Sequence, residues 1–398
     1  MPLDVVETLC DLIRLPSVNP MGRDVSGEEF YEYRVTDYLE RTFERLGLSW
    51  QRQPIAPKRD NILARFDGDV PPDEGGKILM FEVHQDTVPV DGMTISPWTP
   101  EVRDGRVYGR GACDIKGGMA CILAALARLV EQRPTGLPTI VMACSVNEEY
   151  GFTGASQMPK VWGNDDGTLV PRAPDAVVVA EPTELNVVVA HKGVARWRCH
   201  THGRAVHSSQ PELGDNAIYR MAHVLSAWEE YARDVVPNLG HHPLVGTPTL
   251  SVGIIAGGVS VNTVPDRCTI EIDRRVLPDE DPITALEHAK AYLANKLGDP
   301  QAVEHDEPQL TIRGLKDDQN ASLAAGLSET SRRHGGPGEC VGVPYGTDAP
   351  AFFPDGIPTV VFGPGSIDQA HTADEWVAVD QLHAATEIFY QFACEYGG

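Results

Sequence analysis

The sequence lacks the features of a membrane protein or a nucleic-acid-binding protein. Lys and Arg number 33 against 57 Asp and Glu, a formal net charge of −24 at pH 7. Such a surface repels nucleic-acid phosphates and anionic membranes, although the same acidity also serves plain solubility. No apolar run is long enough to cross a bilayer, and the first residues lack a basic segment followed by an apolar one. We therefore expect no nucleic-acid partner, no membrane partner and a cytoplasmic location.

The eight cysteines lack the spacing of a metal site or a disulfide framework. They are scattered between Cys10 and Cys394, none forms a CxxC pair, and several, such as Cys144, lie inside apolar runs. Cysteines of this kind are typical of reduced core residues in a cytosolic protein.

The 398 residues are many for a single core, so we expect two domains. Near-continuous apolar strands alternate with helices in the first and last parts of the chain, which predicts a mostly parallel α/β sheet covered on both faces. The predicted helices are residues 4–15, a second from Ser26, where Ser26 and Glu29 have capping-box spacing, to Gly47, and residues 116–131, 320–334 and the C-terminal segment. The predicted strands are residues 77–83, 138–144, 175–180 and 358–362.

Between these parts the pattern changes. Residues 194–201 and 267–276 alternate apolar and polar side chains, as strands with one wet face do, and helices are expected at 214–233 and 282–297. We predict a catalytic domain formed by residues 1–186 and 309–398. An α+β domain with an antiparallel sheet, residues 187–308, is inserted between them.

His and carboxylate side chains follow the predicted strands of the catalytic domain. Ligands bind beyond the carboxyl ends of the strands in open parallel sheets, so these residues are expected on one rim. Imidazoles and carboxylates that converge there coordinate a zinc-like ion or a pair of ions. The residues are His84, Asp86, Asp114, Glu148, Glu149, Glu181 and His371.

Each of these residues also has an ordinary structural explanation. Asp114 suits a helix N-cap, and His84 suits a hydrogen-bonding residue at a strand end. Glu148 and Glu149 suit solvated loop charges, and Glu181 before Pro182 suits a turn. These explanations do not account for the placement of every residue on the same edge of one sheet.

Four motifs resemble the co-catalytic, dinuclear zinc metallopeptidase family. That family includes acetylornithine deacetylase, succinyl-diaminopimelate desuccinylase, aminoacylase and glutamate carboxypeptidase. The resemblance covers nearly the whole chain. The motifs, in the family's order, are His84-Gln-Asp-Thr-Val-Pro89, Gly109-Arg-Gly-Ala-Cys-Asp-Ile-Lys-Gly-Gly118, Asn147-Glu-Glu-Tyr-Gly-Phe-Thr-Gly-Ala155 and Ala370-His-Thr-Ala-Asp-Glu375.

The resemblance implies a site for two divalent metal ions, zinc first, with cobalt or manganese as alternatives. Asp114 would bridge both ions, His84 and Glu181 would complete one position, and Glu149 and His371 the other. A bridging carboxylate suits two ions that act together in hydrolysis. Asp86 would accept the ring N–H of His84 and fix its tautomer, and Glu148 would act as general base.

Three residues of the inserted domain resemble substrate-binding positions of the family. His207 corresponds to a lid histidine that helps to bind the oxyanion, often from the partner chain of a dimer, although a surface histidine remains the alternative. Asn262 resembles a substrate-holding residue. Arg274 continues the face of Cys268, Ile270 and Ile272 on its predicted strand, where a charge is expected to meet an anion such as a substrate carboxylate or else to reach solvent.

We therefore expect hydrolysis of an amide bond in a small substrate that carries a carboxylate, by a homodimer. An N-acyl amino acid deacylase is the first hypothesis, and a carboxypeptidase or dipeptidase of the same family is the alternative. A protein that binds amino acids without catalysis is a third hypothesis, but the presence of Glu148 argues against it because metal binding alone does not need a base.

Overall fold

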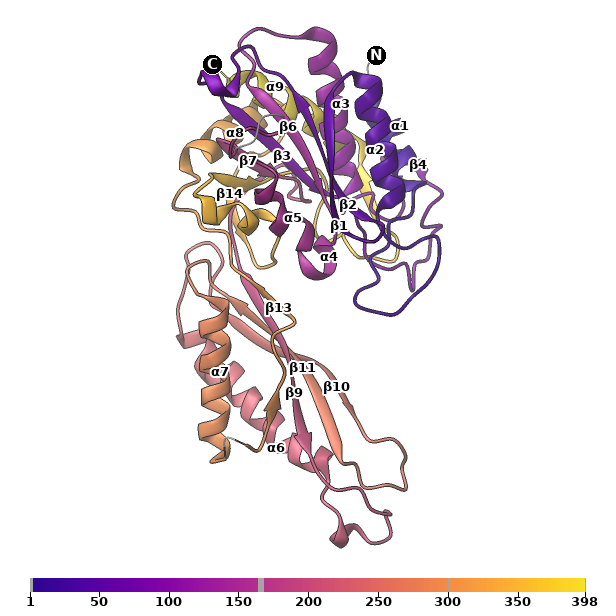
Figure 1. Cartoon of the computed structure of the whole chain (residues 1–398), viewed down its shortest axis with the longest axis vertical. Helices are drawn as coiled ribbons and strands as arrows, with labels where there is room; N and C mark the ends of the chain where they lie inside the picture. The colour runs from indigo at the N-terminus through magenta and orange to yellow at the C-terminus, as the bar shows by residue number, and fades with distance from the viewer. Residues whose placement is uncertain (1–2, 164–167, 300, 398) are drawn as a thin grey trace. The chain divides into compact units, whose positions relative to one another are not determined.

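The protein divides into two compact units (Figure 1). The structure is a computed structural model that describes residues 3–163, 168–299 and 301–397. Unit 1 runs to Val189, resumes over Asp317–Val341 and continues from Thr347, whereas unit 2 comprises Ala190–Lys316 and Gly342–Gly346. The chain therefore changes unit after residues 189 and 316, where the sequence indicated 186 and 308, and it returns briefly to unit 2 at residues 342–346.

Unit 1 is organised around an eight-stranded sheet in the order β1-β2-β6-β3-β7-β15-β8-β14. The four neighbours β6, β3, β7 and β15 run parallel, and β1, β2 and β8 are antiparallel to their neighbours. The expected mostly parallel sheet is confirmed. The strands are Ser49–Ala56 (β1), Arg59–Phe66 (β2), Ile78–His84 (β3), Thr139–Ser145 (β6), Ala176–Val179 (β7), Val187–His191 (β8), Cys340–Val343 (β14) and Thr359–Val361 (β15).

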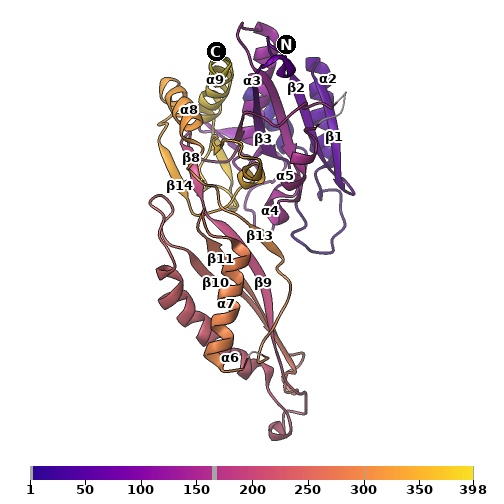
Figure 2. The same cartoon turned by 60° about the vertical axis from the view of Figure 1, so that its left-hand side comes forward.

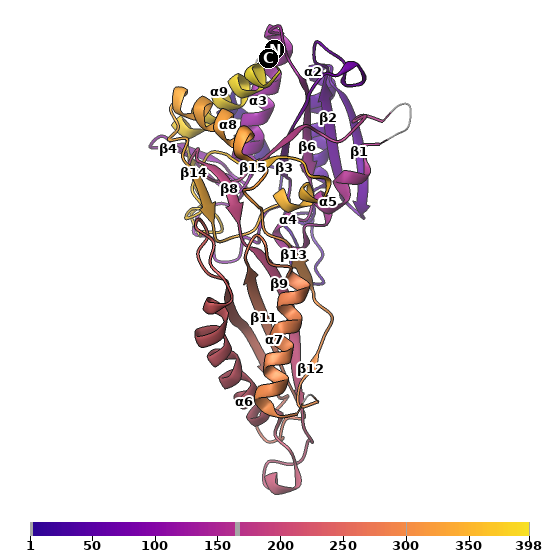
Figure 3. The ribbon, with the colours of Figure 1, turned by 90° about the vertical axis from the view of Figure 1, so that its left-hand side faces the viewer.

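The long helices of unit 1 share one core with alternate residues of this sheet. Every residue of β3 and β6 is buried, as their continuous apolar sequences predict. Helix α3 packs between α1 and α9, and Figures 1 and 3 show α3 beside α9. The helices are Val5–Ile13 (α1), Tyr33–Leu46 (α2), Lys116–Gln132 (α3), Glu148–Gly151 (α4), Thr153–Gln157 (α5), Ala321–Arg333 (α8) and Val379–Tyr396 (α9).

A second, three-stranded antiparallel sheet lies in the same unit and has the order β16-β5-β4. Its strands are Trp376–Ala378 (β16), Arg106–Tyr108 (β5) and Glu101–Arg103 (β4). Tyr108 pairs with Trp376, so the segment after β5 begins next to the segment that precedes β16. This pairing brings residues far apart in the chain to one place, and the site depends on it.

Two features of unit 1 differ from the sequence-based expectation. The strands β1, β2, β8 and β14 of the main sheet and the three strands of the second sheet were not predicted. Helix α2 begins at Tyr33 rather than near Ser26, because the backbone of Val18 accepts from Tyr31 and donates to Glu29, which holds that segment extended. The capping-box spacing of Ser26 and Glu29 is therefore not used.

Unit 2 contains an antiparallel sheet with two helices on one face, as the alternating pattern predicted (Figure 2). Its core joins β9 and β11 to α6 and α7, with the rings of Trp197 and Trp228 5.9 Å apart. The sheet has the order β10-β11-β9-β12, and β13 also pairs with β9. The elements are Gly193–His202 (β9), Ala217–Glu230 (α6), Thr249–Gly257 (β10), Arg267–Val276 (β11), Pro282–Leu297 (α7), Glu304–His305 (β12) and Leu310–Ile312 (β13).

All eight cysteines are free, and six of them are buried. Among the described residues, none of the helices combines the length and the apolar character that a membrane span requires.

Candidate metal centre

Three parallel strands bring four of the predicted residues to one edge of the main sheet. His84 is the last residue of β3, Glu148 and Glu149 open α4 just after β6, and Glu181 lies two residues beyond β7. Because β3 runs parallel to both β6 and β7, the carboxyl ends of the three strands coincide. The convergence that the sequence suggested is therefore built by strand register.

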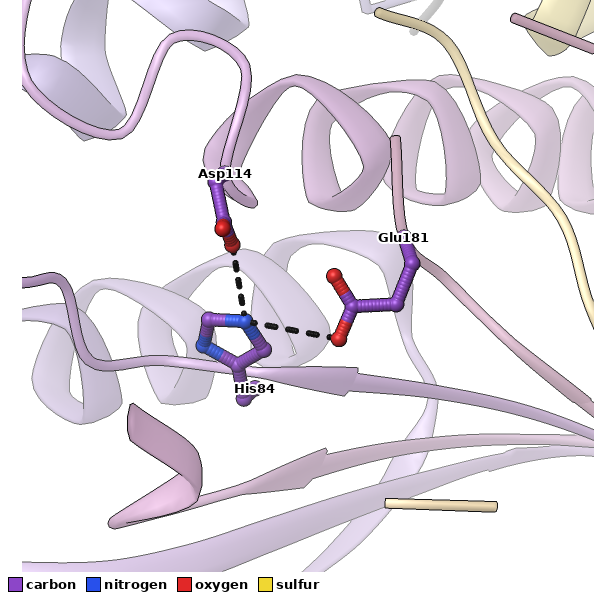
Figure 4. Close-up of side chains that lie close together, drawn as sticks. All are labelled: His84, Asp114 and Glu181. Carbon is purple, nitrogen blue, oxygen red and sulfur yellow. Dashed lines mark hydrogen bonds and ion pairs between the residues drawn. The ribbon is translucent and has the colours of Figure 1, made fainter. Parts of the chain in front are cut away.

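The first group of side chains is formed by His84, Asp114 and Glu181, all of them buried (Figure 4). The Nε2 atom of His84 lies 3.1 Å from Asp114 Oδ1 and 3.8 Å from Glu181 Oε1. Figure 4 shows both carboxylates directed at the same ring nitrogen from different elements of unit 1.

The second group shares Asp114 with the first and adds Glu149 and His371. The Nε2 atom of His371 lies 3.2 Å from Asp114 Oδ2 and 3.2 Å from Glu149 Oε2. The two oxygens of Asp114 thus face different histidines. The side chain of His371 is 51% exposed, whereas those of Asp114 and Glu149 are buried, so the second group opens toward solvent.

The ring of His84 has a defined orientation. Its Nδ1 atom lies 3.0 Å from the backbone carbonyl oxygen of Asp86, which can only accept, so Nδ1 carries the proton in the neutral ring. The nearest carboxylate oxygen of Asp86 is 3.6 Å away. The expected acceptor for this proton was the Asp86 carboxylate; the structure assigns that part to its backbone carbonyl. The lone pair of Nε2 then faces carboxylate oxygens, an arrangement that a cation between them would stabilise.

The carboxylate of Asp86 holds the turn that carries Glu148 and Glu149. Its Oδ1 accepts from the backbone N–H of Glu148 at 3.1 Å, and its Oδ2 accepts from that of Glu149 at 3.1 Å. Asn19 Nδ2 donates to Asp86 Oδ2 at 2.7 Å and to Asn147 Oδ1 at 2.9 Å. Asn147 has a positive φ of 62°, which turns the chain sharply before the two glutamates.

The buried acidic groups of the site shift one another's pKa. Burial, followed by the charge of Asp114, raises the pKa of Glu149 to about 7 and that of Glu181 well above its ordinary range. Burial likewise raises the pKa of Glu148, although His84 opposes the shift. The carboxylates of Asp114 and Glu149 raise the pKa of His371 to about 10. The pocket therefore favours added positive charge.

The donor set fits a pair of divalent cations. Two imidazoles and three carboxylates are ligand types that zinc accepts, and the two groups share one carboxylate. The Oε1 atom of Glu149 is buried and has no hydrogen-bond partner within the described chain, so it is available to coordinate a cation. Within the residues that the structure describes, these two groups are the ones with the geometry of a metal site.

A buried acidic pair lies on the opposite face of the sheet from the helical core. Glu82, two residues before His84 on β3, is fully buried near Asp348, whose Oδ2 accepts from Ser145 Oγ at 2.8 Å. Burial, followed by Asp348, raises the pKa of Glu82 well above its usual range.

In unit 2, His207 and Asn262 lie on neighbouring segments. His207 forms an isolated β-bridge with Thr263, and the backbone N–H of Ser208 donates to the Asn262 carbonyl at 3.0 Å. Both residues are exposed. The backbone N–H of Ser209 donates to His207 Nδ1 at 3.2 Å, so the neutral ring carries its proton on Nε2 and can donate from there.

Arg274 lies on the inner face of β11, as the alternation of Cys268, Ile270 and Ile272 indicated, and it is completely buried. The anion that it meets there belongs to the chain itself, because Arg274 Nη2 donates to Glu280 Oε1 at 2.6 Å. Binding of a substrate carboxylate by Arg274 stays a prediction, and its charge already has a partner.

Sequence reasoning missed Asn19 and gave Glu375 no role of its own. Asn19 follows the first helix in a Ser-Val-Asn-Pro stretch, and Glu375 ends a recognised motif. Glu375 acts mainly through backbone N–H groups of a distant loop, and Asn19 acts through the side chains of Asp86 and Asn147. Partners so far apart in the chain leave no pattern in a single sequence.

Comparison with known proteins identifies a family of peptidases and a deacetylase among the relatives of this chain. Residues 80–395 match Peptidase family M20/M25/M40. The acetylornithine deacetylase of Vibrio cholerae is 32% identical over 393 residues, which cover 97% of this chain and 96% of the relative.

Two solved structures have a similar fold. A family M20 metallo-carboxypeptidase from Sulfolobus solfataricus has a TM-score of 0.77 at 18% identity and covers 99% of each chain. A dinuclear metal-binding family M20 peptidase from Bacillus subtilis has a TM-score of 0.67 at 17% identity, over 98% of this chain and 97% of that one.

Proposed function

The chain belongs to peptidase family M20/M25/M40, whose members hydrolyse amide bonds, and from that premise we propose that it is a metal-dependent deacylase of an N-acyl amino acid. The observation that carries the proposal is the pair of His and carboxylate groups joined through Asp114. The 32% identity to an acetylornithine deacetylase favours a substrate in which the amide joins an acyl group to an amino acid, rather than one in which it joins two amino acids.

In this proposal the five residues bind two divalent cations, with zinc as the first choice. His84, Asp114 and Glu181 form one position, and Asp114, Glu149 and His371 form the other. When bound, such ions supply Lewis acidity that polarises a carbonyl and makes water more acidic. The buried surroundings of the site strengthen this effect because they lower the local dielectric constant.

Glu148 acts as the general base of the reaction. Its backbone N–H is held by Asp86, beside the ligand Glu149, while its own carboxylate is left for proton transfer. Burial raises the pKa of this carboxyl group above its ordinary range, and a higher pKa makes the carboxylate a stronger base. Glu148 accepts a proton from the attacking water and delivers it to the leaving amine nitrogen.

The residues of unit 2 complete the proposal. His207 donates from Nε2 to the developing oxyanion, and Asn262 beside it helps to hold the substrate. We also propose a homodimer formed through β10, an edge strand whose Ile254 and Ile255 are more than half exposed. A cytoplasmic location, expected from the unpaired cysteines, is part of the same proposal.

A substrate panel tests the assignment. Protein loaded with zinc, cobalt or manganese is incubated with N-acetylornithine, other N-acetyl amino acids, N-succinyl amino acids and dipeptides, and released amine is measured. We expect turnover of an N-acyl amino acid with a free carboxylate. Preferential cleavage of dipeptides would replace the deacylase by an exopeptidase, and no turnover of any substrate by metal-loaded protein would favour a binding protein.

The variant Glu148→Gln tests the base. We expect kcat to fall by about 10²–10⁴-fold, because the amide cannot accept the proton, while bound metal stays unchanged. Both quantities are measured by steady-state kinetics and elemental analysis. The matched control is Glu131→Gln, at an exposed position in the last turn of α3, which should leave kcat unchanged. Equal activity of Glu148→Gln and the control would contradict the role of Glu148.

A further inference from the structure

The carboxylate of Glu375 is fully buried and accepts four hydrogen bonds from one short loop. Its Oε2 accepts from Arg110 Nη1 at 2.7 Å and from the backbone N–H of Gly111 at 2.9 Å. Its Oε1 accepts from the backbone N–H groups of Cys113 at 2.8 Å and Asp114 at 2.9 Å. Both oxygens are thus engaged by two donors each.

These bonds join two segments that each contribute to the second group of the site. One segment follows β5 and ends in Asp114, and the other contains His371 and ends in Glu375 before β16. The backbone N–H of Gly109 donates to the Glu375 carbonyl at 3.1 Å, which extends the β5–β16 pairing toward the site. Arg110 also donates through Nη2 to the Pro89 carbonyl at 3.1 Å, so the loop is anchored on both sides.

We propose that Glu375 is a positioning residue that fixes Asp114 relative to His371 and so maintains the metal position formed with Glu149. The inference rests on the proposed function, in which these residues bind metal. The other position depends less on Glu375, because His84 and Glu181 are fixed by the ends of β3 and β7 in the main sheet. Loss of Glu375 should therefore affect the two positions unequally.

Glutamine cannot take the place of Glu375. Each carboxylate oxygen receives two N–H donors, so either orientation of the amide would direct an NH₂ group at two donors. The buried N–H groups would lose their acceptor, and the loop would move away from the amide to recover hydrogen bonds. Asp114 is the residue at the end of that loop.

Metal stoichiometry tests the inference without reference to activity. Purified wild-type protein and Glu375→Gln are dialysed against limiting buffered zinc, and bound metal is counted by elemental analysis. We expect two ions per chain in the wild type and one in Glu375→Gln, with a dissociation constant for the second ion raised about 10–100-fold. Asp374→Asn, which removes the same charge at the adjacent exposed position, should bind two ions.

A second variant keeps the test decisive if Glu375→Gln does not fold. Glu375→Asp retains the charge but is one methylene shorter, so it reaches only part of the donor set and should weaken the second ion selectively. Binding of two ions with wild-type affinity by either variant overturns the inference, as does an equal loss at both positions. Failure of the wild type to bind metal overturns the proposed function instead.

Discussion

Two buried carboxylates hold the loops of the site in place because each accepts hydrogen bonds from several backbone N–H groups. The carboxylate of Asp86 accepts hydrogen bonds from the backbone N–H groups of Glu148 and Glu149. The carboxylate of Glu375 accepts from three backbone N–H groups of one loop and from the side chain of an arginine. Hydrogen bonds to an ionised acceptor are stronger than neutral ones, and in a buried setting they also define geometry. Asp114 and the Glu148–Glu149 turn are therefore positioned by acids that belong to neither group of side chains, whereas His84 and Glu181 are positioned by the ends of β3 and β7.

Asn19 gives a test of this arrangement. In Asn19→Asp an acceptor would replace the amide that donates to Asp86 at 2.7 Å, so two carboxylates would face each other in a buried place. We expect a loss of about 1–3 kcal/mol in the free energy of unfolding and a lower kcat, because the Glu148–Glu149 turn loses its support. Urea unfolding and steady-state kinetics measure these effects. Asn238→Asp, at an exposed position in unit 2, is the control, and equal behaviour of the two variants would refute the expectation.

The five residues of the two metal-binding groups were accessible from the sequence, whereas Asn19 and the role of Glu375 were not. His84 and Glu181 adjoin continuous apolar strands, and strand direction alone sends them to one edge. The partners of Glu375 are mostly backbone N–H groups, which every residue carries, and those of Asn19 are side chains far away in the sequence. The pairing of Arg274 with Glu280 was not predicted for a similar reason, since Glu280 comes to it through a turn that the strand pattern does not describe.

At the scale of the elements, β10 is an exposed edge strand of the sheet in unit 2. It pairs with β11 on one side, and on its other side no strand of the described chain adds to the sheet. Exposed isoleucines on an edge strand are a liability for a monomer, and the proposed homodimer would cover them. Elements with one regular pattern, such as α7, were predicted to the residue, whereas β1 and β2 were missed because their polar residues obscure the alternation.

Sedimentation analysis tests the role of β10. We expect the wild type to sediment at twice its 43.3 kDa chain mass, and Ile255→Lys to shift toward the monomer because a charge would be buried at the interface. Val102→Lys, on the exposed strand β4 of unit 1, provides a matched change at a similarly exposed position. A monomeric wild type at micromolar concentration would contradict the dimer and any contribution of His207 from a partner chain.

At the scale of the whole molecule, the two units are joined where the chain enters and leaves unit 2. The backbone of His191 exchanges hydrogen bonds with Leu315, at 3.2 Å and 3.1 Å, so the start and the end of the long segment of unit 2 are paired. The imidazole is fully buried, and burial lowers its pKa from 6.5 to about 4. Folding therefore keeps this ring neutral at a pH at which the unfolded chain would protonate it.

The stability of the protein should depend on pH through His191. Because the folded pKa lies below the unfolded one, the contribution is present above pH 6.5 and is lost as the pH falls toward 4. Between pH 7 and pH 5 the wild type should lose roughly 1–2 kcal/mol more than His191→Gln, which does not titrate. Urea unfolding at several pH values gives the difference directly, and parallel profiles for the two proteins would disprove it.

The order of the ligands along the chain has a consequence for biosynthesis. His84, Asp114 and Glu181 all precede unit 2, whereas His371 follows it. During translation all three residues of the first group are synthesised before unit 2. The second group must await nearly the last residues, so the insertion of unit 2 separates the two metal positions in time as well as in sequence.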